Sequence, residues 1–151
     1  MIYFADTSAL VKRYIDEVGS GYVRSLLVAP DHIFYQSFLT PLEITSTFYR
    51  QHRTHALSAE ELTLVLQAYT THSHEEYALI PYSEDLMNTA AALIARHPLR
   101  TLDAIQLAAA LSLRAALPAG APPIIFLSAD DRLMAVARRE HLLAENPNDH
   151  S

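Results

Sequence analysis

The most constraining feature of this sequence is its alternation of short apolar runs with longer segments of helical periodicity. The apolar runs are residues 2–5, 32–35, 77–81 and 124–127, with Leu142 and Leu143 as a candidate fifth. Continuous apolar runs of this length predict strands buried on both faces, as in a parallel sheet. Strands that alternate with helices predict an α/β fold of three layers, with a central parallel sheet of four to five strands flanked by helices.

Local signals mark several of the expected helices. Ser58 and Glu61 fit a capping box, and Pro41 suits the first turn of a helix. The segment from residue 101 to about 117 is apolar almost all round, which predicts a central helix. The chain shows no repeat or linker, so we expect one domain over residues 1–145 and a flexible tail over residues 146–151.

Composition excludes several classes of chemistry. The 151 residues contain no Cys, which excludes thiol catalysis, disulfides and thiolate metal sites. Only three Gly are present, and no glycine-rich phosphate loop can be found. The net charge of −6 argues against non-specific binding of nucleic acid. Without an apolar run long enough to span a membrane or a leader pattern, we expect a cytoplasmic protein.

Four acidic residues follow strands or open helices. Asp6 follows the first strand, Asp130 follows the fourth, and Glu43 and Asp103 lie in the first turns of their helices. Judged singly, Asp6 and Asp130 suit helix caps, Asp103 suits a helix dipole and Glu43 could simply be exposed, and these alternatives stay open. The carboxyl ends of parallel strands, however, share one edge of the sheet. We therefore expect the four side chains to converge there.

A cluster of this kind needs a cation nearby, or some of its carboxylates must hold protons. Two carboxylates about 4 Å apart repel each other by roughly 4 kcal/mol at an effective dielectric constant near 20. Oxygen ligands without Cys suit Mg²⁺ or Mn²⁺. Such a metal can activate water and stabilise a leaving oxygen, which indicates phosphodiester chemistry.

The four acidic segments also resemble a known family. An apolar strand runs into Asp-Thr-Ser-Ala-Leu at residues 6–10, and Glu43 lies within Pro-Leu-Glu-Ile. Asp103 begins Asp-Ala-Ile-Gln-Leu-Ala-Ala-Ala, and Asp130 lies within Phe-Leu-Ser-Ala-Asp-Asp-Arg-Leu. In this order they resemble the PIN-domain family, and within it the VapC-like ribonuclease toxins of prokaryotic toxin–antitoxin pairs. The resemblance implies a PIN fold, a divalent-metal endoribonuclease, an RNA substrate, a homodimer and inhibition by a small antitoxin.

The resemblance also implies roles for individual residues. The family's four acids match Asp6, Glu43, Asp103 and Asp130. It makes Asp6, Asp103 and Asp130 the ligands of Mg²⁺ or Mn²⁺, and Glu43 a ligand or the residue that orients the water. Hydroxyls in supporting positions belong to Thr7, Ser8 and Ser128. Arg100 is a candidate contact to an RNA phosphate, against the alternative of a merely exposed arginine, and Asp131 ranks below Asp130.

Other enzyme classes with an aspartate after the first strand fit this sequence less well. A haloacid-dehalogenase-type phosphatase needs a second acid two residues after the first, where Ser8 stands. A receiver domain needs a late lysine, and the only lysine is Lys12. The remaining alternative is a catalytically silent PIN-like module that binds RNA or protein, which would be expected to lack one or more of the four acids.

Overall fold

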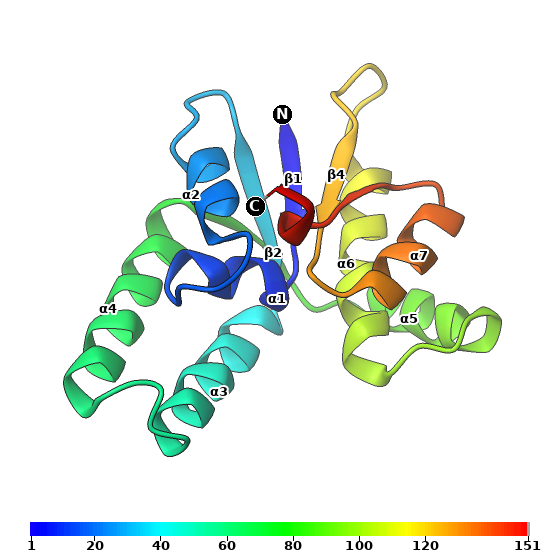
Figure 1. Ribbon diagram of the computed structural model, residues 1–151. Coiled ribbons are helices and arrows are strands. Elements are labelled where there is room, and N and C mark those ends of the chain that lie inside the picture. Colours follow the sequence, from blue (N-terminus) through cyan, green and yellow to red (C-terminus); the bar gives the residue numbers. More distant parts are fainter. Residues whose placement is uncertain (151) are drawn as a thin grey trace.

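The strand β1 (Ile2–Ala5) is buried along its whole length and forms the centre of the fold. It lies between β2 (Ile33–Ser37) and β4 (Ile124–Leu127), while β3 (Tyr77–Ile80) and β5 (Leu143–Glu145) complete the two edges. The order is β3-β2-β1-β4-β5, and every neighbouring pair is parallel. Figure 1 shows β1 between β2 and β4. The prediction of a central parallel sheet is confirmed.

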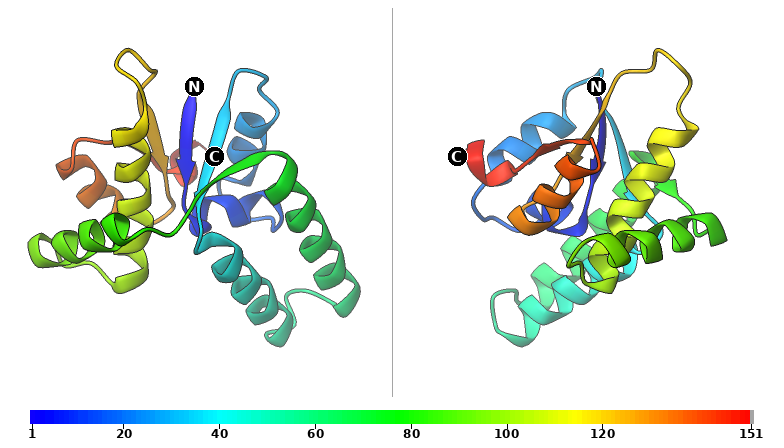
Figure 2. Two further views of the ribbon diagram at one scale, coloured as in Figure 1. Left: turned by 180° about the vertical axis from the view of Figure 1, so that it is seen from behind. Right: turned by 90° about the vertical axis from the view of Figure 1, so that its right-hand side faces the viewer.

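Helices cover both faces of this sheet, which gives the three predicted layers (Figure 2). The computed structural model describes residues 1–150. Its helices are α1 (Thr7–Leu10), α2 (Ser20–Leu27), α3 (Thr40–Arg53), α4 (Ala59–Glu75), α5 (Glu84–Arg96), α6 (Thr101–Ala116) and α7 (Asp131–Arg139), with the 3-10 helices η1 (Val11–Arg13) and η2 (Pro147–His150). The predicted capping box forms between Ser58 and Glu61. In this part of the chain, no helix is both long and apolar enough to cross a bilayer.

Alternate residues of β1 anchor the two helical layers. The ring of Phe4 stacks on that of Phe126, with centroids 5.8 Å apart, in the core formed with α5, α6 and α7. On the other face, Tyr3 stacks on Phe34 at 5.0 Å, in the core formed with α1 to α4. Burying one such side chain stabilises the fold by about 1.5–3 kcal/mol. The ends of β1 and β4, and the residues that follow them, are therefore firmly positioned.

Residues 146–150, which we expected from the sequence to form a flexible tail, pack against the rest of the fold. Asn146 is buried, and its Nδ2 donates a hydrogen bond to Oδ1 of Asp131 at 2.8 Å. The ring of His150 in η2 stacks on Tyr22 of α2, with centroids 3.8 Å apart. These partners lie far away in the sequence, so no local pattern predicted the packing. Ser151 lies outside the described residues.

Candidate active site

The carboxyl ends of β1 and β4 open onto a cleft of about 390 Å³. All four predicted acids line it: Asp6, Glu43, Asp103 and Asp130. Asp6 directly follows β1, and its backbone N–H donates to the carbonyl oxygen of Leu127 at 3.0 Å, which continues the pairing of the two strands into the cleft. The expected convergence is therefore present, and it joins four segments that are far apart in the sequence.

Asp6 lies deepest of the four, with 5% of its surface exposed. Its Oδ1 accepts hydrogen bonds from Ser8 Oγ at 2.7 Å and from the backbone N–H of Ala9 at 3.0 Å, and its Oδ2 accepts one from Ser128 Oγ at 2.7 Å. Burial raises the pKa of Asp6 from 3.8 to about 6, although the two serine hydroxyls and the Ala9 amide oppose this shift. The nearby charge of Glu43 raises the pKa further. A cation in the cleft would favour the ionised carboxylate.

A buried glutamine holds Glu43 in place. Oε1 of Glu43 accepts hydrogen bonds from Gln106 Nε2 at 2.5 Å and from Thr7 Oγ1 at 3.0 Å. The same Nε2 lies 3.2 Å from Thr40 Oγ1, and only 3% of Gln106 is exposed. Sequence reasoning missed Gln106. The available signal was a polar side chain one helical turn after Asp103, within the otherwise apolar stretch of residues 104–111.

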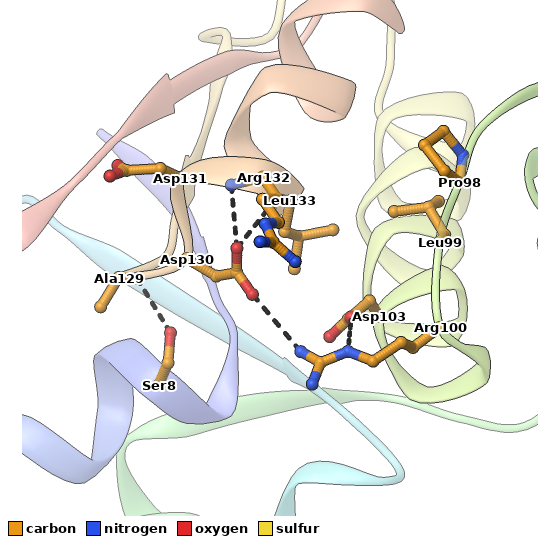
Figure 3. Close-up of a pocket in the computed structure, with 10 residues that line it drawn as sticks. All are labelled: Ser8, Pro98, Leu99, Arg100, Asp103, Ala129, Asp130, Asp131, Arg132 and Leu133. Atoms are coloured by element: carbon orange, nitrogen blue, oxygen red, sulfur yellow. Dashed lines mark hydrogen bonds and ion pairs between the residues drawn. The ribbon is translucent and has the colours of Figure 1, made fainter.

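Arg100 joins the other two acids (Figure 3). Its Nε lies 2.8 Å from Oδ2 of Asp103, and one terminal nitrogen lies 3.4 Å from Oδ2 of Asp130. Asp130 is also the N-cap of α7, since its Oδ1 accepts the backbone N–H groups of Arg132 at 2.9 Å and Leu133 at 3.2 Å. One oxygen of Asp130 therefore serves the helix, while the other faces the cleft.

A second hollow, of about 520 Å³, adjoins the first across Arg100, Asp103 and Asp130. Asp131 borders only this second hollow, and its Oδ1 accepts the hydrogen bond from Asn146. Figure 3 shows its carboxylate turned away from Arg100. Asp131 therefore lies outside the cleft that holds the four acids, although it shares the second hollow with Asp103 and Asp130.

The donor chemistry of the cleft fits a hard divalent cation. Carboxylate and hydroxyl oxygens surround it, and a positive guanidinium already lies between Asp103 and Asp130. Within residues 1–150, no group of three or more acidic or histidine side chains is arranged so that it could hold a metal ion. Asp6, Asp103 and Asp130 remain the candidate ligands, and binding would require their side chains to turn toward a common point.

Comparison with known proteins gives a likeness of structure. No family model matches the sequence, and no curated protein matches it. A chain in the crystal structure of FitAcB from Neisseria gonorrhoeae superposes with a TM-score of 0.69 at 14% identity, covering 97% of this chain and 98% of that chain. A chain of VapBC2 from Rickettsia felis, bound to a DNA fragment from its promoter, gives 0.66 at 14% identity with the same coverage.

A third neighbour is VapC20 from Mycobacterium tuberculosis, described as a sarcin-ricin loop cleaving toxin. Its TM-score is 0.63 at 15% identity, covering 88% of this chain and 93% of that chain. At these identities the likeness is one of fold. The predicted three-layer PIN-like fold is confirmed.

Proposed function

We propose that this protein is a metal-dependent endoribonuclease and the toxin of a toxin–antitoxin pair. The observation that carries the proposal is the convergence of Asp6, Glu43, Asp103 and Asp130 in one cleft at the carboxyl edge of a parallel sheet. Clustered carboxylates suit Mg²⁺ or Mn²⁺, which are the ions that commonly serve phosphodiester hydrolysis. The shared fold with VapC20, named for cleavage of the sarcin-ricin loop, supports RNA as the substrate.

The residues of the proposed site have different roles. Asp6, Asp103 and Asp130 would hold one or two Mg²⁺ or Mn²⁺ ions. A bound ion would supply activated water and stabilise negative charge on the phosphate and the leaving oxygen. Ser8 and Ser128 orient the carboxylate of Asp6 through their 2.7 Å hydrogen bonds.

Glu43 is suited to act on the water. Gln106 and Thr7 fix its Oε1, and no donor among the described residues reaches Oε2. Oε2 is therefore the atom that can orient the attacking water and accept its proton. Gln106 is a positioning residue in this scheme because it acts through Glu43.

The partners follow from the same proposal. Neighbours of the same fold include chains of VapBC2 and of a toxin–antitoxin complex from Klebsiella pneumoniae, which supports a small antitoxin as the partner of this chain. A homodimer and a cytoplasmic location complete the proposal. Expression of the protein should arrest growth, and co-expression of its antitoxin should relieve the arrest.

The rival function is a catalytically silent binding module. Such a module would not need to keep all four acids, or the hydrogen bonds that orient Asp6 and Glu43. The receiver-domain alternative is also disfavoured. The ammonium of Lys12 is buried and donates to Glu17 Oε1 at 2.9 Å and to the carbonyl oxygen of Val18 at 2.7 Å, so it is already engaged.

The deciding experiment is cleavage of a structured RNA pool with Mg²⁺, with Mn²⁺ and with EDTA. Asp103→Asn should lower the rate by more than about 100-fold, beyond the 10- to 100-fold loss typical of residues that only support a ligand. Asp85→Asn is the matched control, because Asp85 is an exposed carboxylate in the first turn of α5. Cleavage by Asp103→Asn at the wild-type rate, or unchanged cleavage in EDTA, would refute the proposal.

A further inference from the structure

Arg100 occupies an unusual place for an exposed arginine. It is the N-cap residue of α6, where its donor-only guanidinium cannot accept a capping hydrogen bond. The guanidinium instead reaches Asp103 within its own helix and Asp130 in the loop after β4. Figure 3 shows it between the two carboxylates. Arg100 lines both hollows.

The two carboxylates need a cation between them, and Arg100 supplies one. Asp103 and Asp130 are partly shielded from water, with 23% and 30% of their side chains exposed. Their mutual repulsion is relieved by the guanidinium that both approach. The two nitrogens of Arg100 contact one oxygen from each acid, so the arginine holds both acids at once.

The ion pairs of Arg100 with Asp103 and Asp130 are weak enough to be broken by a competing cation. The side chain of Arg100 is 79% exposed, and exposed ion pairs contribute little because water screens them and the long side chain loses rotamer freedom. A divalent cation carries twice the charge and binds carboxylate oxygens directly. The oxygens that Arg100 contacts, Oδ2 of both acids, are among those such an ion would require.

We propose that Arg100 is the internal counter-ion of the metal-free site, and that a divalent metal binds Asp103 and Asp130 by displacing its guanidinium. The inference rests on the proposed function, since it assumes that these acids hold the metal. Under this proposal Arg100 does not help to bind the metal. Arg100 competes with the metal, and removal of its side chain tightens metal binding.

The test compares Mn²⁺ affinity by calorimetry in the absence of RNA. Arg100→Ala should bind Mn²⁺ about two- to fivefold more tightly than the wild type, the fold-change that corresponds to a competing surface ion pair. Arg132→Ala is the matched control. Arg132 lines the hollow beside the site and carries the same charge, but it makes no ion pair with either acid among the described contacts. Its effect should therefore be smaller, and Arg100→Lys should fall between Arg100→Ala and the wild type.

A second readout follows the guanidinium itself. The Nε–H NMR signal of Arg100, assigned by its loss in Arg100→Lys, should shift when Mg²⁺ is added. The Nε–H signal of Arg96, which is bonded to Glu140 outside the cleft, should stay in place. An unmoved Arg100 signal at saturating Mg²⁺ would overturn the inference.

The two proposals fail in different ways. If Arg100→Ala binds Mn²⁺ no more tightly than Arg132→Ala, while Asp103→Asn loses Mn²⁺, the counter-ion role is wrong and the metal site stands. If the wild type binds no Mn²⁺, or Asp103→Asn binds it as well as the wild type, both proposals fail.

Discussion

At the scale of single residues, the surroundings of Asp6 in the cleft disfavour its ionised form. Asp6 is buried beside the charge of Glu43, and its pKa is raised to about 6 even though Ser8, Ser128 and the Ala9 amide donate hydrogen bonds to it. An ionised carboxylate in such a place costs folding free energy at neutral pH. A bound cation would offset this cost. The folding stability of the metal-free protein should therefore depend on the ionisation of Asp6.

Asp6→Asn should therefore stabilise the metal-free protein at pH 8 relative to the wild type. Because the pKa of Asp6 is about 6 in the folded protein and 3.8 as the ordinary value, the folded state binds more protons between those values. Stability from this group is thus lost as the pH rises from about 4 to 6, by at most on the order of 3 kcal/mol. Denaturant unfolding in EDTA at pH 4.5 and pH 8 measures the difference, with Asp85→Asn as an exposed control. Parallel pH profiles for Asp6→Asn and the wild type would contradict it.

Individual residues also show what the sequence could predict. The strand ends located Asp6 and Asp130, because apolar runs and the rule for parallel sheets depend on local patterns. Gln106 was not recognised because its role depends on contacts with Thr7 and Glu43, which lie in other segments. The pairing of Arg100 with Asp130 was missed for the same reason, since the two lie thirty positions apart.

At the scale of secondary structure, one residue can serve both a helix and the site. Asp130 caps α7 with Oδ1 and faces Arg100 with Oδ2. The sequence presented these roles as alternatives, a cap or a site residue. The structure shows the carboxylate placed for both, because the helix begins where the strand-end loop meets the cleft.

Two substitutions at Asp130 should separate these roles. Asp130→Asn keeps a capping oxygen and loses the charge, so its thermal stability should stay near the wild type while metal binding weakens. Asp130→Ala removes the cap as well and should cost about 1 kcal/mol of additional stability. Thermal unfolding in EDTA measures the change in stability, and calorimetry with Mn²⁺ measures the change in metal binding. Equal destabilisation by the two variants would show that the cap contributes nothing.

Elements with local start signals were the ones predicted well. α3 begins at Thr40, with Pro41 in its first turn as predicted, and the capping box opens α4. The central helix α6 is buried over residues 104–110. Residues 146–150 lacked any such signal, since a short polar segment resembles a tail unless its distant partners are known.

At the scale of the whole molecule, the C-terminal segment returns across the sheet and packs against α2, an early helix of the chain. β1 pairs with β4, β4 pairs with β5, and η2 continues from β5 toward α2 (Figure 1). Tyr22 Oη donates to Glu145 Oε1 at 2.7 Å and its ring stacks on His150. The last described residues therefore pack against α2 and complete the helical layer on that face of the sheet.

Gly19 lies directly against the backbone of this C-terminal segment. Its φ is +83°, and a Cβ added there would lie 2.6 Å from the backbone of Pro147. Gly19→Ala should destabilise the protein by about 1–2 kcal/mol, through the left-handed backbone conformation and the clash with η2. Gly21→Ala is the matched control two residues away: its added Cβ meets nothing within 4 Å, and in α2 it should stabilise by about 0.5–1 kcal/mol. Denaturant unfolding measures both changes, and limited proteolysis should cut the C-terminal segment faster only in Gly19→Ala. A Gly19→Ala protein as stable as Gly21→Ala would mean that η2 does not hold this loop.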